Sequence, residues 1–103
     1  MGSPLSNKAP GATAIVALTD NIALSIMQQA KKRGLEIPRD LSVVGFDDAP
    51  EAALADPPLT TIRTSAAENG RTAARLLLDG GPPRQILVPV KLVVRSSTAT
   101  PRR

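Results

Sequence analysis

The 103-residue chain contains no cysteine, histidine, tryptophan or tyrosine, and Phe46 is its single aromatic residue. Without histidine or cysteine, the chain lacks imidazole and thiolate metal ligands, a thiolate nucleophile and a Ser-His-Asp triad. The absence of cysteine is typical of cytoplasmic proteins, and it also occurs in secreted proteins that have no disulfides. We therefore expect no metal, no cofactor and no enzymatic activity, and we expect the protein to be cytoplasmic.

Long apolar runs are also absent. No stretch approaches the ~20 apolar residues of a transmembrane helix, and no charged segment precedes an apolar segment of the signal-peptide type. We therefore expect no membrane partner. Met1 to Ser3 resembles an expression remnant, and Pro4 to Gly11 is rich in proline, glycine and polar residues. Residues 1–11 are accordingly predicted to be a disordered lead.

The chain is basic, with a net charge of +4 and a sequence pI near 10.4. A nucleic-acid-binding protein would concentrate these charges on one surface, whereas here they are scattered apart from Lys31 to Arg33 and the terminal Arg102 and Arg103. Lys31 to Arg33 falls at the end of a predicted helix, where cations complement the helix dipole. A phosphate-binding patch is the alternative interpretation of this cluster.

Two short apolar runs predict parallel strands. Thr13 to Leu18 and Leu41 to Phe46 are bounded by turn formers, which is typical of strands buried on both faces. The helix between them is predicted to start with Thr19 or Asp20 as its N-cap and to bury a stripe formed by Ala23, Ile26, Met27 and Ala30. A strand–helix–strand segment of about 34 residues has the length of a βαβ unit. The predicted fold class is therefore α/β, in one domain at most.

Polar side chains follow both predicted strands. Thr19 and Asp20 follow the first strand, and Asp47 and Asp48 follow the second. Because the carboxyl ends of parallel strands share one edge of a sheet, we expect these residues to surround one crevice, where ligands bind in open α/β sheets. The Phe46 ring beside hydrogen-bond acceptors suits a polyhydroxylated ligand such as a sugar.

The sequence predicts different roles for the two acids that follow the second strand. Ligand contact and plain solvation both remain open for Asp47. Asp48 begins a capping-box pattern with Glu51, so its carboxylate is predicted to cap the next helix.

The second half of the chain predicts further helices and strands. The capping box from Ser65 to Glu68 opens a helix that runs to about Asp79, and Gly70 within it is predicted to permit close packing against a neighbouring element. The other predicted segments are a helical turn at Pro50 to Ala55, a strand at Leu59 to Thr64, strand-like chain from Gln85 to Arg95 on both sides of Pro89, and a polar tail from Ser96 to Arg103.

Several segments, taken in order, resemble one family of proteins. They are Ala17 to Leu24, Arg33 to Asp40, Leu41 to Asp48, Pro57 to Arg63, Glu68 with Gly70, and Leu87 to Thr98. The ordered set is similar to the C-terminal portion of a lac-repressor/galactose-repressor-type transcriptional regulator. The similarity extends over nearly all of the chain between Ala12 and Thr98.

The resemblance implies a fold and a domain context. Such regulators join an N-terminal helix-turn-helix DNA-binding domain to an effector-binding core of two α/β lobes, like those of periplasmic sugar-binding proteins. Residues 12–98 would be the C-terminal portion of that core, a partial Rossmannoid sheet with flanking helices, and residues 99–103 a disordered tail. Thr60 to Thr64 would cross between the lobes, and the helix after Ser65 would belong to the N-terminal lobe. The protein would contact DNA only through a domain that this chain does not contain.

The resemblance also implies site residues. Matched position by position, it assigns effector binding to Thr19, Asp20 and Asp47. Members of the family dimerise through the helix that carries Leu24 and through the turn that carries Ala53, Leu54 and Ala55. Leu24 lies outside the predicted core stripe, so partial exposure is the alternative to a dimer contact.

Three functions follow from these observations. The first is the effector-binding and dimerisation portion of a repressor-type regulator, which senses a sugar or a related metabolite and couples it to DNA affinity as a homodimer. The second is an exported sugar-binding protein of the same fold that delivers its ligand to a transporter. The third is a hydrolase that uses Asp20 and Asp47 as a carboxylate pair, although no nucleophile with an evident activator accompanies them.

The isolated chain has a further expected property. If it is one part of a two-lobed domain, apolar faces of its sheet and helices should be exposed. Self-association or strand exchange would then cover these faces.

Overall fold

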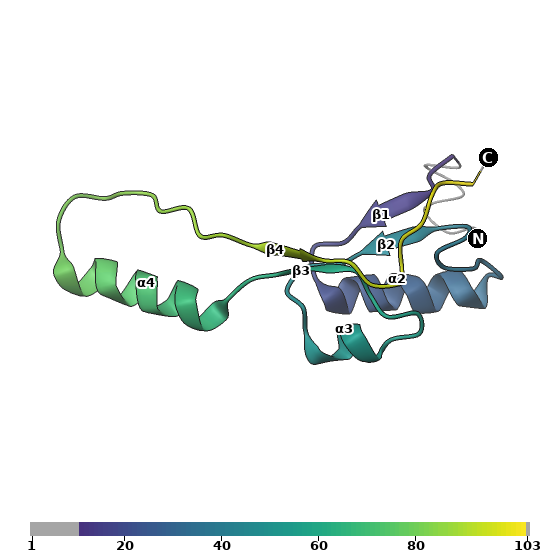
Figure 1. The fold of residues 1–103 in the computed structure, drawn as a ribbon, viewed down its shortest axis with the longest axis horizontal. Helices are drawn as coiled ribbons and strands as arrows, with labels where there is room; N and C mark the ends of the chain where they lie inside the picture. The colour runs from purple at the N-terminus through teal and green to yellow at the C-terminus, as the bar shows by residue number, and fades with distance from the viewer. Residues whose placement is uncertain (1–10, 103) are drawn as a thin grey trace.

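The computed structural model describes residues 11–102 (Figure 1). The elements in chain order are β1 (Ala14–Val16), α2 (Asp20–Lys32), β2 (Ser42–Val44), α3 (Pro50–Leu54), β3 (Thr61–Arg63), α4 (Ala66–Asp79) and β4 (Lys91–Val93). The predictions for Met1 to Pro10 and for Arg103 lie outside the described residues. Within residues 11–102, no helix is both long enough and apolar enough to cross a membrane.

The predicted βαβ unit is confirmed. Strands β1 and β2 pair in parallel, with Ala14 opposite Ser42 and Val16 opposite Val44. Helix α2 connects them, and its N-cap Thr19 accepts a hydrogen bond from the backbone N–H of Ile22 (3.3 Å). Most of the predicted stripe is buried in the core, which is formed by Ala17, Ala23, Met27, Ala30, Ile37, Leu41, Val43, Ala52 and Leu59. The fold class predicted from the sequence is therefore correct.

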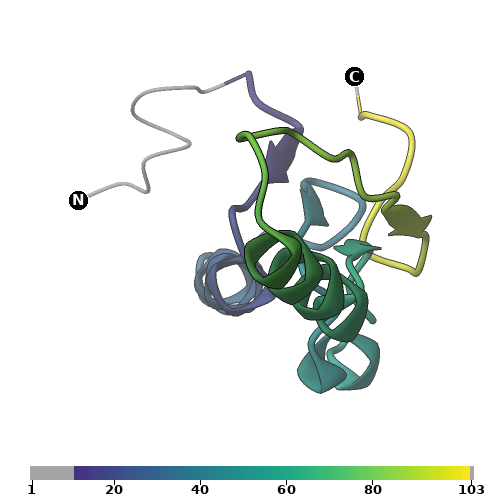
Figure 2. The same cartoon turned by 90° about the vertical axis from the view of Figure 1, so that its left-hand side faces the viewer.

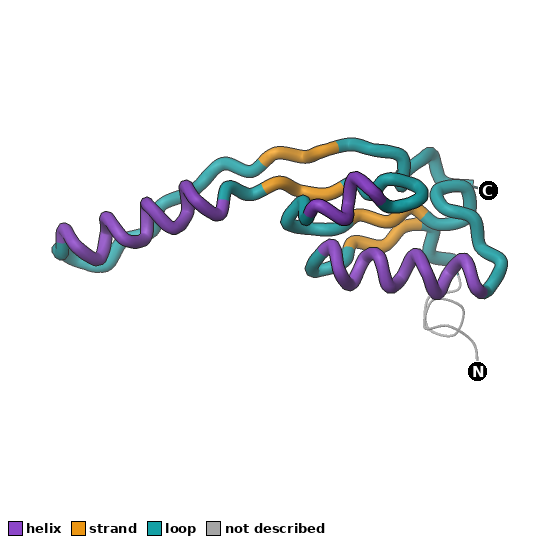
Figure 3. The backbone as a smooth tube through the Cα atoms, turned by 90° about the horizontal axis from the view of Figure 1, so that it is seen from below, coloured by secondary structure: helices purple, strands orange, loops and turns teal. Residues whose placement is uncertain are grey.

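Strand β3 extends this small sheet on its β2 side. Isolated parallel bridges join Val44 to Thr60 and Asp47 to Arg63, and β3 pairs with β4 in an antiparallel register. Helices α2 and α3 lie on the same side of these strands (Figure 3). Strands β3 and β4 also run beyond the core toward α4, so they are the only described strands that connect the core with that helix.

Helix α4 lies apart from the rest of the described chain. It begins as predicted, because Ser65 accepts a hydrogen bond from the Glu68 backbone N–H (3.2 Å), but none of its residues is buried. Figure 2, which looks along the long axis, shows α4 in front of the other elements. The predicted close packing at Gly70 is wrong for the described chain, since a Cβ at this position would meet no atom within 4 Å.

Two predictions for the C-terminal part need correction. No strand forms before Pro89, because residues 80–90 have no neighbouring strand to pair with, and only Lys91–Val93 is a strand. The predicted polar tail does not start at Ser96. Ser97 is fully buried, donating its hydroxyl to the Val43 carbonyl oxygen (2.6 Å) and accepting from the Thr60 N–H (2.8 Å).

The basic cluster at Lys31 to Arg33 lies at the C-terminal end of α2, as predicted. Lys31 and Lys32 are in the last turn, and the Lys31 ammonium donates to the carbonyl oxygen of Asp56, beyond α3. These positive charges therefore complement the helix dipole, and Lys31 also joins α2 to the loop after α3.

Candidate functional site

The polar ends of β1 and β2 are neighbours, as the sequence predicted. The backbone N–H of Asp20 donates to the carbonyl oxygen of Phe46 (3.0 Å), which joins the start of α2 to the end of β2. Thr19 is partly buried at this edge, and Asp47 is exposed. Thr19, Asp20, Phe46 and Asp47 are thus brought together by the parallel pairing of two strands that are far apart in sequence.

Asp20 is buried beneath this edge. Only 1% of the residue is exposed, and both carboxylate oxygens accept short internal hydrogen bonds. Oδ1 accepts from the Thr61 hydroxyl (2.6 Å), and Oδ2 accepts from the Ala49 backbone N–H (2.6 Å). The family resemblance assigned effector contact to Asp20, and in this structure its carboxylate joins β3 to the loop after β2.

Gly45 makes this arrangement possible. A Cβ at this position would lie 2.3 Å from the Asp20 Oδ1 and 3.0 Å from the Leu59 Cδ2. Only glycine therefore allows the end of β2 to pass so close to the buried carboxylate.

Asp47 is exposed at this edge, and its backbone conformation is unusual. Its φ of 115° is unusual for a non-glycine residue, and its backbone N–H donates to the Ile62 carbonyl oxygen (2.8 Å). Its carboxylate accepts no hydrogen bond from the part of the chain that the structure describes. Phe46 beside it is 37% exposed. This edge therefore presents a hydrogen-bond acceptor next to an apolar ring.

The capping prediction for Asp48 is wrong. Helix α3 begins after Ala49 without a side-chain cap, and the Asp48 carboxylate instead contacts two arginines. Oδ2 lies 2.7 Å from the Nε of Arg63, and Oδ1 lies 2.8 Å from the Nη2 of Arg95. The hydrogen bond from Arg63, followed by that from Arg95, lowers the pKa of Asp48 below its ordinary value. A pair of charged partners outcompetes the local backbone N–H groups for this carboxylate.

Sequence reasoning missed three residues that shape this edge. Arg63 and Arg95 hold Asp48, and the Thr61 hydroxyl holds Asp20. Each lies between 15 and 47 positions from its partner, so no local pattern connects them. The sequence held one signal for these contacts, which is Arg63 within the β-branched segment Leu59 to Thr64. A charged side chain among such residues often forms an ion pair with an acidic side chain.

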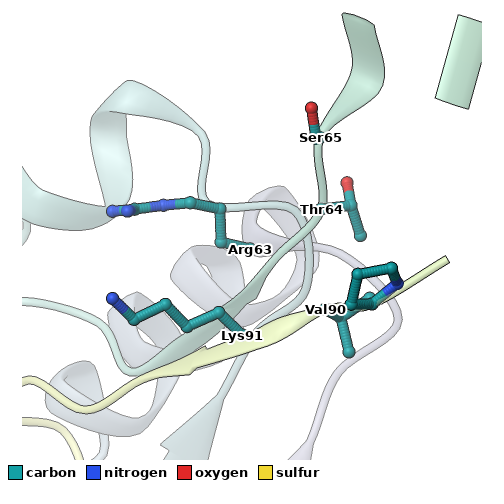
Figure 4. Close-up of a pocket in the computed structure, with 6 residues that line it drawn as sticks. Arg63, Thr64, Ser65, Val90 and Lys91 are labelled. Carbon is teal, nitrogen blue, oxygen red and sulfur yellow. The ribbon is translucent and has the colours of Figure 1, made fainter. Parts of the chain in front are cut away.

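A shallow pocket lies where β3 and β4 continue toward α4. It has a volume of about 350 Å³ and is lined by Arg63, Thr64, Ser65, Pro89, Val90 and Lys91. Figure 4 shows the side chains of Arg63 and Lys91 running alongside one another from the paired strands. None of the three predicted effector residues lines this pocket, although the bridge between Asp47 and Arg63 makes the two regions adjacent.

The predicted dimer residues are distributed over two helices. Leu24 is partly buried and packs against the core, and Ala55 does the same. Ala53 is exposed, and Leu54 is 84% exposed. Leu54 is therefore the largest apolar side chain that this predicted face offers to a partner.

The chemistry of the site does not favour hydrolysis. The hydrolase hypothesis requires Asp20 and Asp47 to act as a pair on a substrate, yet Asp20 is buried and both of its oxygens are hydrogen-bonded. Among residues 11–102, no group of three acidic, histidine or cysteine side chains is placed to hold a metal ion.

Comparisons of sequence and of structure with known proteins agree on one family. The model of the periplasmic binding protein-like domain matches residues 3–98. The HTH-type transcriptional regulator MalR of Streptomyces coelicolor is 45% identical over 93 residues, which cover 85% of this chain and 27% of MalR.

Two solved structures are similar in fold. The transcriptional regulator CelR–cellobiose complex superposes with a TM-score of 0.83 at 33% identity, covering 90% of this chain and 30% of CelR. The lac repressor dimer bound to operator and the anti-inducer ONPF gives a TM-score of 0.82 at 34% identity, covering 93% of this chain and 35% of that protein. The chain thus spans about a third or less of each of these three relatives.

Proposed function

This chain belongs to the periplasmic binding protein-like domain family, and we propose that it forms one wall of the effector site in a transcriptional regulator of the lac-repressor type. The observation that carries the proposal is the meeting of Thr19 and Asp47 at one sheet edge, held by the hydrogen bond from Asp20 to Phe46. The helix-turn-helix domain would lie outside the chain, so DNA contact is proposed for the whole regulator only.

A sugar or a related polyhydroxylated metabolite is the proposed effector. Asp47 offers an exposed carboxylate that can accept hydrogen bonds from hydroxyl groups, and the exposed part of the Phe46 ring offers an apolar surface for C–H groups. The similarity to CelR, which was solved with cellobiose, supports this ligand class. Thr19 adds a hydroxyl at the same edge, but this hydroxyl already accepts from Ile22 as the helix cap. Asp47 is therefore the principal proposed ligand.

Asp20 takes a different part in the proposed site. Since its oxygens are occupied by Thr61 and Ala49, it positions the loop that carries Asp47. We therefore propose direct effector contact for Asp47 and Thr19, and support of the site for Asp20.

Dimerisation is the second part of the proposed function. Leu54 and Ala53 are exposed on α3, and Leu24 lies on the neighbouring helix α2. The similarity to the lac repressor, solved as a dimer, supports a homodimer, and the exposure of Leu54 and Ala53 supports α3 as part of its interface.

Titration of the full-length regulator with cellobiose, maltose and ribose tests the effector site. We expect at least one sugar to bind, and we expect Asp47→Asn to weaken that binding about 10-fold or more, because hydrogen bonds to charged groups contribute ~1.5–3 kcal/mol. Asp79→Asn, at the exposed end of α4, is the control and should bind as the wild type does. Equal affinity for Asp47→Asn and the wild type would contradict the proposed ligand role.

A further inference from the structure

Asp47 and Asp48 are adjacent acids with different surroundings. The Asp47 side chain is exposed and has no partner within residues 11–102, whereas the Asp48 side chain is 11% exposed and contacts two arginines. Both residues have positive φ values, 115° and 57°, which non-glycine residues seldom adopt. Residues in this conformation persist only where their surroundings hold them, and Asp47 and Asp48 share one peptide bond.

The backbone of the same dipeptide is attached to β3. The N–H of Asp47 donates to the Ile62 carbonyl oxygen (2.8 Å), and the N–H of Asp48 donates to the Thr61 hydroxyl (3.3 Å). The end of β2 and the strand β3 are therefore connected through both backbone and side-chain contacts.

The Asp48 carboxylate bridges the two strands that lead to and from α4. Arg63 is the last residue of β3, and Arg95 follows the end of β4. Arg95 is further fixed, because its Nη1 donates to the Leu59 carbonyl oxygen and its backbone N–H donates to the Thr60 hydroxyl (both 2.9 Å). One carboxylate thus sets the position of both strands relative to the end of β2.

We propose that Asp48 is the positioning residue that transmits effector binding at Asp47 to β3 and β4, an inference that rests on the proposed function. A ligand that donates hydrogen bonds to the Asp47 carboxylate moves the backbone that Asp47 and Asp48 share. The Asp48 carboxylate then moves relative to Arg63 and Arg95. Hydrogen bonds between charged groups depend strongly on distance and alignment, so the two arginines follow the carboxylate. Strands β3 and β4 then change orientation, and α4, which they connect to the core, moves with them.

The charge of Asp48 is constant under physiological conditions. A carboxylate is ionised at neutral pH, and the hydrogen bonds from Arg63 and Arg95 lower the pKa of Asp48 below its ordinary value. The transmission therefore responds to the ligand, not to protonation. It requires a carboxylate, because an amide at this position carries no charge to hold both guanidinium groups.

Three matched substitutions in the full-length regulator test this proposal, namely Asp48→Asn, Asp47→Asn and Asp40→Asn. Asp40 is the control, because it is a partly buried carboxylate with a pKa lowered chiefly by the hydrogen bond from the Glu36 N–H, and it contacts Arg39 and Arg102 but no residue of β3 or β4. Calorimetric titration with cellobiose, maltose and ribose measures sugar affinity. Amide hydrogen exchange in residues 59–64 and 91–95, with and without sugar, measures the response of the two strands.

The expected results separate the two acids. Asp48→Asn should bind sugar within about threefold of the wild type while losing the exchange response of both strands, and Asp47→Asn should lose affinity. Asp40→Asn should match the wild type in both measurements. Arg63→Gln, which removes one half-exposed partner of Asp48, should give a partial loss and serves as a second variant if Asp48→Asn does not fold.

Other results would overturn the inference. A full exchange response in Asp48→Asn or, where that variant does not fold, in Arg63→Gln would show that the strands respond without the Asp48 bridge, while the proposed function would stand. Loss of affinity in Asp48→Asn equal to that in Asp47→Asn would make Asp48 a ligand and not a transmitter. If none of the sugars binds the wild type, the proposed function fails and the inference fails with it.

Discussion

At the scale of single residues, two carboxylates decide the shape of the candidate site. The sequence places Asp20 and Asp48 directly after predicted strands, and in the structure both carboxylates accept hydrogen bonds from within the chain. A carboxylate that leaves water needs hydrogen-bond donors, and the donors here belong to the loop after β2, to β3 and to the segment after β4. Asp47, which has no such donors within residues 11–102, remains the acid that faces outward.

Gly45→Ala should destabilise the chain by about 1–3 kcal/mol, the usual cost of adding atoms to a packed interior. The new Cβ would clash with the Asp20 Oδ1 and the Asp20 Cα. Neither atom can move easily, because Oδ1 is hydrogen-bonded to Thr61 and Cα is part of the backbone. Urea denaturation measures the change. The control is Gly70→Ala, which meets no neighbour and should leave helix α4 equally stable or more stable by ~0.5–1 kcal/mol. Equal loss of stability in both variants would show that the contact with Asp20 is not the cause.

At the scale of elements, the two long helices have similar sequence signals and different environments. Helix α2 has a hydroxyl N-cap and buries Ala23, Met27 and Ala30, whereas α4 has the same kind of cap and buries no residue. Its Leu77 and Leu78 are 81% and 82% exposed. Most helix stability in proteins comes from packing of an apolar face, so α4 depends on its cap and on intrinsic helix propensity.

Amide hydrogen exchange should therefore distinguish the helices of the isolated chain. We expect the amides of α4 to exchange much faster than the central amides of α2, because α4 can open without exposing any core residue. Ser65→Ala should accelerate exchange in α4 further, since loss of an N-cap costs about 1 kcal/mol. The exchange of α2 is the internal reference. Equal protection of both helices would mean that α4 is packed against a surface in solution.

At the scale of the whole molecule, the chain is elongated. Its Cα radius of gyration is 17.3 Å, compared with about 13 Å for a compact domain of 100 residues. Large apolar side chains are exposed on several elements, among them Val16 and Leu18 at β1 and Leu54 on α3. The structure therefore has the exposed apolar surface that the sequence predicted for part of a two-lobed domain.

Light scattering of the isolated chain tests whether this surface is covered by self-association. We expect a species larger than a monomer at micromolar concentration, because burial of exposed apolar side chains favours association. Leu54→Asp should shift the chain toward the monomer if α3 is part of the contact, and Gln28→Asp, on an exposed position of α2, should have no effect. A compact wild-type monomer would contradict the prediction.

The sequence predicted the family and the βαβ unit for reasons that are local. Alternating apolar and polar segments, the caps at Thr19 and Ser65 and the ordered motifs are all readable along the chain, and the match of the family model to residues 3–98 confirms the resemblance. The same local reasoning failed for Asp48, where a capping-box pattern was outcompeted by Arg63 and Arg95. It also failed before Pro89, where β-favouring residues have no strand beside them.

By itself, the sequence determined the βαβ unit, the two capped helices α2 and α4, and the placing of Thr19, Asp20 and Asp47 at one edge, because periodicity and parallel pairing follow from short stretches of chain. Only the tertiary structure decided which of the three acids at this edge, Asp20, Asp47 and Asp48, is exposed to a ligand. That outcome depends on donors contributed by Ala49, Thr61, Arg63 and Arg95, and folding alone brings these groups to their carboxylates. Asp20 and Asp48 have hydrogen-bond donors and are largely shielded from solvent. The Asp47 carboxylate has no donor among residues 11–102 and is exposed.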